Sequence, residues 1–269
     1  MMPGTSRRVA YWIAAAFGVL GAALYLFPDR AGRNFAWTVT PFVTMTIGAW
    51  FLGGAFVAWR SARLGAWSTA YPGLLFLGVF GILQSAVLLV SSGDLEVRGQ
   101  PGAGYLLAVA AVTLAGLWWV YEWSRDRGEP ASGGTPTPLA LRVVSAVFVL
   151  FSAFFGIRLL FGISQGGNIW PGVLSPVTGR SFGAFYLALA IAVAPLVFSR
   201  TLAPILALLP AAVVGSVVIT IPALVHIELF DFGARPGGLV YLGTYLLAAL
   251  VATVILLRVR LAANRRGSG

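Results

Sequence analysis

The chain has 269 residues, of which 59% are hydrophobic and only 10% are charged, and its mean hydropathy is +0.89. This composition lies far outside that of soluble domains and predicts a protein of the lipid bilayer. The formal net charge is +10, all 18 basic residues are arginines, and these stand mostly singly or in pairs at the ends of apolar runs. That distribution argues against a nucleic-acid-binding protein. The absence of cysteine excludes disulfides, thiolate nucleophiles and sulfur metal ligands.

Eight apolar runs are long enough to cross a bilayer as helices, which satisfy their own backbone groups in lipid. They cover residues 9–27, 41–58, 72–91, 102–121, 143–162, 181–199, 201–225 and 237–257. The first run follows Arg7 and Arg8 in the manner of a signal peptide. It lacks a convincing small-residue cleavage site, so we expect it to remain as a signal-anchor helix.

A short acidic segment occurs twice in the chain. Residues 95–97, Leu-Glu-Val, followed by Pro101-Gly102, return 135 positions later as Phe-Asp-Phe at 230–232, followed by Pro236-Gly237. At the same offset, residues 41–55 match residues 176–190 at proline, glycine and aromatic positions. One residue of slippage pairs Asn34 with Asn168. Matches of this kind are harder to produce by chance than matches of leucine and alanine, so they predict an internal duplication.

The sequence therefore predicts an all-α membrane protein with eight transmembrane helices in two parallel tandem four-helix repeats. The first repeat covers residues 1–122, a polar linker rich in proline and glycine covers 123–139, and the second repeat covers 140–269. Because each repeat has an even number of spans, both enter the membrane in the same direction. A pseudo-twofold axis along the membrane normal would then relate them.

The arginines predict the orientation in the cell membrane. Twelve of them fall on the side that holds both termini and the linker, and five on the other side, namely Arg30, Arg33, Arg98, Arg180 and Arg235. The positive-inside rule places the side with more arginines in the cytoplasm. We therefore expect cytoplasmic N- and C-termini and a cytoplasmic linker, with the two acidic segments on the outer face.

The acidic segments supply the first candidate site residues. Glu96 and Asp231, with Glu228 and His226 close by in sequence, could bind a cation or a basic ligand, or act as an acid/base pair. The alternative is that each acid lies in a solvated corner, where it caps a helix or pairs with a neighbouring arginine. Metal sites generally draw on several ligands, and the sequence has a single histidine, so we expect an interfacial His226 and no metal.

Arg158 is a candidate of a different kind, because it lies inside an apolar run. In the slipped register its counterpart in the first repeat is Leu24. A charge in a transmembrane helix often marks a functional site, although an arginine near a helix end can reach the interface with its long side chain. A structural pair with Glu228 or Asp231 also fits. The candidate ligand-binding residues of the outer face are thus Glu96, Asp231, His226, Glu228, Arg158, Asn34 and Asn168.

Two sequence motifs make this chain similar to other membrane proteins. Pro-x6-Gly-Ala-aromatic-aromatic-Leu begins at Pro41 and at Pro176, and His226-x3-Phe-Asp-Phe precedes a last span with Tyr241 and Tyr245. The chain resembles uncharacterised multi-pass membrane proteins of actinobacteria. The resemblance implies the membrane class and brings no activity with it.

Three functions remain open on the sequence alone. The leading interpretation is an accessory or partner-binding membrane component without a catalytic site or cofactor, which binds a membrane protein or another copy of itself, because charge is scarce at membrane depth. The second is a small-solute transporter or channel along the interface between the repeats, lined by Gln84, Arg158, Glu96 and Asp231. The third is a lipid-modifying enzyme that uses His226 and the outer carboxylates. No phosphate-binding loop is present, so an ATP-driven motor is not expected.

Overall fold

The computed structural model describes residues 1–125, 135–162 and 174–267. Within these ranges the chain is all-helical, and eight helices are long and apolar enough to cross a membrane. The eight are α1 (Gly4–Leu26), α3 (Pro41–Leu64), α4 (Trp67–Val90), α5 (Gln100–Arg125), α6 (Leu139–Leu160), α7 (Pro176–Val197), α8 (Ala203–Val225) and α9 (Gly237–Gly267). A short helix α2 (Pro28–Arg33) and two 3-10 turns, η1 (Ser92–Asp94) and η2 (Ile227–Leu229), complete the described elements. The all-α class and the eight predicted spans are confirmed.

Two helix starts follow the same local design. Thr40 precedes Pro41 at the start of α3, and its hydroxyl accepts a hydrogen bond from the Val43 N–H. Ser175, 135 positions later, caps α7 in the same way. A hydroxyl cap satisfies one unpaired N–H of the first turn, and proline at the first position needs no partner for its missing N–H.

The connection between α3 and α4 is shorter than the sequence predicted. Arg63 lies inside α3, which ends at Leu64, and α4 already begins at Trp67, so Pro72 lies within α4. Gly65 ends α3 in the left-handed conformation, with φ of 63°, which glycine adopts without steric cost. The connection between the first two predicted spans, 9–27 and 41–58, likewise contains a helix, α2, because Pro28 can occupy the first turn of a helix.

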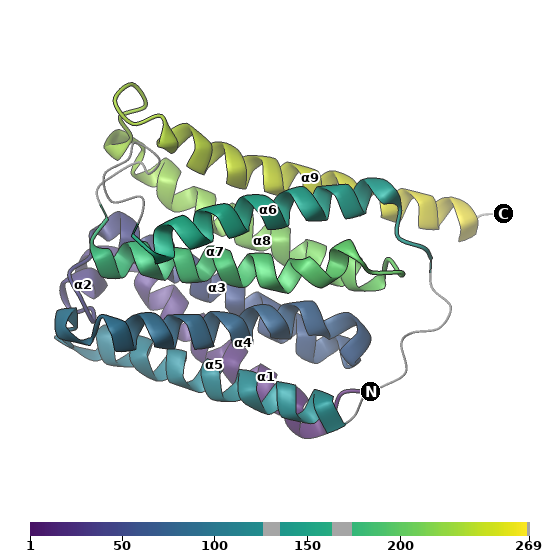
Figure 1. Ribbon diagram of the computed structural model, residues 1–269, viewed down its shortest axis with the longest axis horizontal. Helices are drawn as coiled ribbons and strands as arrows, with labels where there is room; N and C mark the ends of the chain where they lie inside the picture. The colour runs from purple at the N-terminus through teal and green to yellow at the C-terminus, as the bar shows by residue number, and fades with distance from the viewer. Residues whose placement is uncertain (126–134, 163–173, 268–269) are drawn as a thin grey trace.

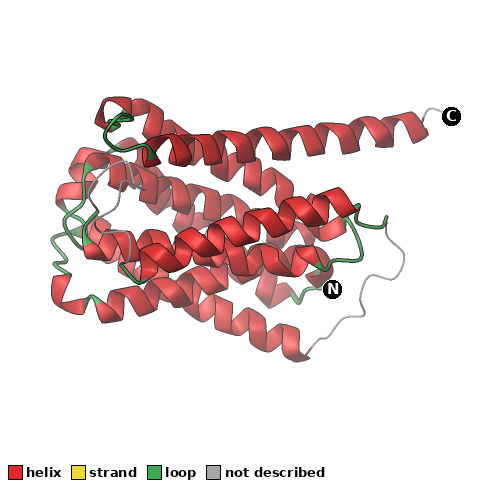
Figure 2. Cartoon of the chain, turned by 45° about the horizontal axis from the view of Figure 1, so that its top comes forward, coloured by secondary structure: helices red, strands yellow, loops and turns green. Residues whose placement is uncertain are grey.

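The helices form one bundle in which each half of the chain packs in a similar way (Figure 1). In the first half α1 packs on α3 and α4 on α5, and in the second half α6 packs on α7 and α8 on α9. Across the halves α4 packs on α7, and α3 packs on α8. The segments 91–99 and 226–236 lie at one end of the bundle, and both termini lie at the other (Figure 1). Figure 2 shows α9 extending beyond its neighbours toward the C-terminus.

Glycines allow two matching pairs of helices to approach closely. A Cβ on Gly21 of α1 would lie 2.8 Å from the Leu52 nitrogen of α3, and a Cβ on Gly156 of α6 would lie 2.7 Å from the Leu187 nitrogen of α7. Gly48 and Gly183 face these contacts from α3 and α7. All four positions correspond at an offset of 135. In this register, without the slippage of one residue, Arg158 aligns with Ala23 instead of Leu24.

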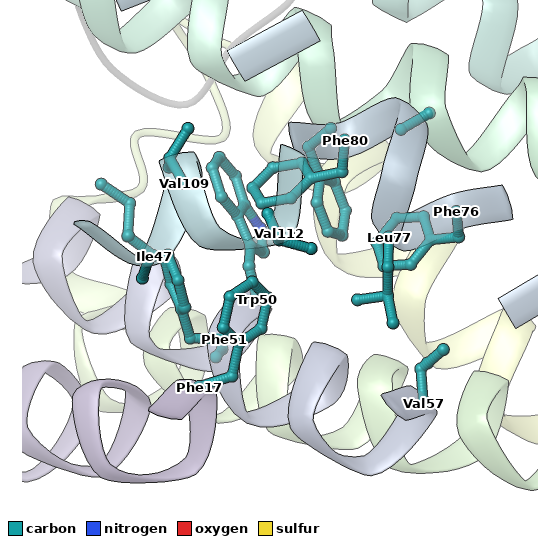
Figure 3. Packing of buried hydrophobic residues seen from close by; sticks show 14 of the residues in the cluster. Phe17, Ile47, Trp50, Phe51, Val57, Phe76, Leu77, Phe80, Val109 and Val112 are labelled. Carbon is teal, nitrogen blue, oxygen red and sulfur yellow. The ribbon is translucent and has the colours of Figure 1, made fainter. Parts of the chain in front are cut away.

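Aromatic rings fill the centre of the bundle. Trp50 of α3 stacks on Phe185 of α7 with ring centroids 4.6 Å apart and an interplanar angle of 10°. Phe80 of α4 meets both rings edge-on. Figure 3 shows Trp50, Phe51 and Phe80 among the buried residues of this cluster. In lipid, where burial of apolar surface gives helices no advantage, such close van der Waals packing supplies much of the association energy.

Candidate functional site

Glu96 lies in the exposed connection between η1 and α5. Its carboxylate forms an ion pair with Arg98, two residues along the chain. Its backbone N–H donates to the carbonyl of Ala36, 2.8 Å away, which fastens this connection to the α2–α3 loop. The side chain therefore takes the exposed ion-pair role that the sequence left open as an alternative.

Asp231 has a different local role. Its Oδ1 accepts hydrogen bonds from the backbone N–H groups of Gly233 and Ala234, at 3.1 and 3.0 Å. An aspartate that bonds to N–H groups two and three residues ahead stabilises a turn. The turn brings the chain from η2 to the start of α9 at Gly237.

His226 follows the last residue of α8 and is mostly buried. Its Nδ1 lies 3.7 Å from a carboxylate oxygen of Glu228, which is itself exposed. Its ring meets Phe42 of α3 edge-on at 6.1 Å, and Phe42 also contacts Phe230 and Tyr241. The Nε2 is buried and makes no hydrogen bond to a described residue. His226 is thus part of an aromatic cluster that joins the two halves.

Asn34 and Asn168 do not form a described pair. The Asn34 amide donates to the Arg30 carbonyl at 2.9 Å, and its backbone carbonyl accepts from the Gly102 N–H. Asn34 therefore ends α2 and ties it to α5. Asn168 lies outside the described residues.

Arg158 lies two residues before the end of α6 and pairs with no described acid. Its guanidinium carbon lies 5.4 Å from the centre of the Phe154 ring, one turn earlier on the same helix. Its Nε is buried without a hydrogen-bond partner among the described residues. The ion pairs in the described ranges are Arg98–Glu96 and His226–Glu228. The expected structural pair of Arg158 with Glu228 or Asp231 is therefore not formed.

In the described ranges, His226 and Glu228 are the candidate residues that lie within ion-pair distance of each other. Within the described ranges, no three histidine, aspartate or glutamate side chains converge on a possible metal position. Each acid interacts with a neighbour in its own turn or loop. No described hydrogen bond or ion pair joins Glu96 to Asp231.

Polar contacts between the halves were less evident from the sequence. The Gln84 amide of α4 donates to the Ser181 hydroxyl of α7 at 2.7 Å, and the hydroxyl of Tyr105 lies beside both. Within the second half, the Tyr186 and Tyr245 hydroxyls lie 2.8 Å apart and join α7 to α9. Gln84 stood out as a polar residue at membrane depth, but its partners could not be read from the sequence. Such contacts commonly hold membrane helices together.

Two further contacts between the halves involve residues that the sequence did not single out. The Trp37 indole N–H donates to the Thr178 hydroxyl at 2.9 Å. Near the other end of the bundle, Arg60 of α3 donates to the Ala207 carbonyl of α8 at 2.7 Å. A small recess next to Arg60, between α3, α4 and α8, has room for about one water molecule. It is too small to hold a solute.

The last helices of the two halves, α5 and α9, differ in which residues they expose. Val112 and Ala115 of α5 are 0% and 5% exposed, whereas Leu247 and Leu250 of α9, 135 positions later in the sequence, are 60% and 61% exposed. In the first half α1 packs against α5, but the described residues show no comparable packing of α6 against α9. Instead α9 buries a different face, which carries Tyr241 and Tyr245. We call the surface around Leu247 and Leu250 the open face of α9.

Fold and site together define the class of this molecule. It is a helical multi-pass membrane protein, and no three histidine, aspartate or glutamate side chains of its described residues could hold a metal ion together. Comparison with protein-family models, with characterised proteins and with solved structures found no match. The functional argument therefore depends on the geometry of this chain alone.

Proposed function

We propose that this chain is an accessory component of the cell membrane that binds a partner protein within the bilayer. The observation that carries the proposal is the open face of α9, where leucines are exposed at positions that the first half buries. Apolar exposure alone does not identify a partner surface in lipid, because lipid tails solvate leucine well. The contrast between two otherwise similar halves is the informative feature.

The framework of the proposal is a tandem duplication of four helices. Three observations support it: the matching glycine contacts at Gly21 and Gly156, the matching hydroxyl caps at Thr40 and Ser175, and the Trp50–Phe185 stack. Trp50 and Phe185 are themselves counterparts at an offset of 135. Contact between counterparts is what a twofold relation produces at its axis. The helix pairs that cross between the halves, α4–α7 and α3–α8, also exchange under this relation.

The packing between the halves favours an accessory role over a transport route. Trp50, Phe80, Phe182 and Phe185 fill the centre of that interface. Pathways for ions or protons are usually marked by ionisable groups at membrane depth. Here the polar groups at depth include Gln84 and Ser181, which bond to each other across the interface. A lipid-modifying enzyme is disfavoured in turn, because His226 lies against Phe42 and beside a single described acid, Glu228.

The partner that fits the open face is a transmembrane helix of another protein. The face is a stretch of leucine and valine on one side of α9, with Gly243 opening directly to the surroundings. A small residue among large ones lets a neighbouring helix approach closely. In the first half the last helix, α5, packs against a neighbouring helix in this way, namely α1.

Photo-crosslinking in native membranes tests this function. A genetically encoded photo-crosslinking residue at Leu247 or Leu250 should give discrete protein adducts. The same residue at Leu107 or Leu114 of α5, which are 71% and 68% exposed, should react with lipid only. An adduct with the mass of two copies of this chain would assign the face to self-association. Equal adduct patterns at all four positions would contradict a partner surface on α9.

A further inference from the structure

Arg158 is a cation without a protein counterion in the described structure. Its Nε is buried and unpartnered, and the guanidinium lies over Phe154 at 5.4 Å. Among the acids at this end of the bundle, Glu96 pairs with Arg98, and Asp231 bonds to backbone N–H groups of its own turn. Asp29 and Asp94 form no ion pair with Arg158 in the described ranges. Glu228 lies beside His226. The charge of Arg158 is therefore left for a group outside the described protein.

The position of Arg158 determines how deep in the membrane a group that neutralises its charge would lie. Arg158 is two residues from the end of a membrane-spanning helix, so its side chain can reach the zone of the lipid headgroups. An uncompensated arginine is costly in the bilayer, and a nearby anion lowers that cost. The planar guanidinium matches the geometry of a phosphate, to which it can donate two parallel hydrogen bonds.

The surface beside Arg158 is apolar and open. Leu150, Phe154 and Ile157 are exposed and lie on the side of α6 that faces away from α7, whereas Ser152 and Gly156 are buried toward α7. A group with a phosphate at the level of Arg158 and hydrocarbon along this surface is a phospholipid. We propose that Arg158 binds the phosphate of an anionic glycerophospholipid whose acyl chains lie along Leu150, Phe154 and Ile157.

The first half lacks such a site. The counterpart of Arg158 is Ala23, and the counterpart of Phe154 is Val19, so α1 offers neither the cation nor the ring. The lipid site belongs to α6 alone and is separate from the open face of α9. It stands or fails independently of the partner-binding function.

The test measures lipid selectivity of the full chain reconstituted in vesicles. Spin-labelled phosphatidylglycerol and phosphatidylcholine report the protein-bound fraction of each lipid. The wild-type chain should prefer phosphatidylglycerol, and Arg158→Gln should reduce that preference roughly two- to fivefold, as the loss of one ion pair near a surface predicts. Arg158→Lys keeps the charge and should retain part of the preference.

Arg180→Gln is the matched control, because Arg180 lies at the same end of the bundle and already donates to the Ser91 hydroxyl at 3.1 Å. It should leave the selectivity unchanged. An unchanged preference in Arg158→Gln, or equal losses in both glutamine variants, would overturn the proposal. Displacement of the labelled lipid by inorganic phosphate would assign Arg158 to a soluble anion and also refute the lipid site. Since Arg158 donates no hydrogen bond to a described residue, Arg158→Gln is expected to fold normally.

Discussion

Glu96 and Asp231 occupy matching places in the sequence, but their carboxylates make different interactions. Glu96 forms an exposed ion pair with Arg98, whereas Asp231 holds the turn before α9 through two backbone N–H groups. An exposed ion pair between flexible side chains contributes little, because water and salt screen the charges. A carboxylate that satisfies backbone donors fixes the chain more firmly.

These roles predict unequal effects of substitution. Glu96→Gln should change the free energy of unfolding by less than about 1 kcal/mol, whereas Asp231→Ala should lower it by about 1 kcal/mol through loss of the turn. Asp231→Asn keeps an oxygen acceptor and serves as the control, with a smaller effect. Thermal unfolding in detergent measures all three variants. A loss in Glu96→Gln as large as that in Asp231→Ala would mean that the ion pair matters more than its exposure suggests.

At the scale of the helix, close packing depends on glycines that the spacing of apolar residues does not reveal. Gly183 of α7 faces the backbone of α6 at Leu160, and an added Cβ would also lie 2.8 Å from the Gly156 carbonyl. Backbone atoms cannot move aside as a flexible side chain can. Gly215 of α8, in contrast, has no atom within 4 Å of the position of an added Cβ.

Gly183→Ala should therefore destabilise the protein by about 1–3 kcal/mol, because α6 and α7 must separate to admit the methyl group. Gly215→Ala is the matched control in a helix of similar length. It should leave the stability unchanged or raise it slightly, since alanine favours the helix over glycine. Unfolding in a denaturing detergent series compares the two variants. Equal stability of both would show that α6 and α7 adjust without cost.

The sequence predicted the helices better than their contacts. Hydropathy located all eight spans, because helix length and apolar composition alone determine whether a segment can cross a bilayer. The ends of α3 and α4 were placed too far apart, since an interfacial turn carrying Arg63 is polar and still helical. The sequence could not predict that α9 buries the side with Tyr241 and exposes the side with Leu247, because this helix is apolar on most sides. The acids were identified, but their local partners depend on turn geometry that a sequence pattern does not specify.

At the scale of the whole molecule, the even number of spans in each half explains why segments 91–99 and 226–236 lie at one end of the bundle (Figure 1). The termini lie at the opposite end. Which end faces the cytoplasm rests on the arginines, twelve of which fall on the side of the termini. The positive-inside rule counts such residues in short loops and near helix ends, as here.

Single-cysteine labelling tests this orientation on a chain that has no cysteine of its own. Gly93→Cys and Ala234→Cys place a thiol in the exposed connections at one end, and Ser124→Cys places one at the exposed end of α5. A membrane-impermeant maleimide added to intact cells should label the first two and spare the third, and lysis should make all three reactive. Labelling of Ser124→Cys alone in intact cells would invert the orientation and keep the fold. If Gly93→Cys is labelled in intact cells and Ala234→Cys is not, the even span count is contradicted. The segments 91–99 and 226–236 lie at one end of the bundle and cannot lie on opposite sides of the membrane.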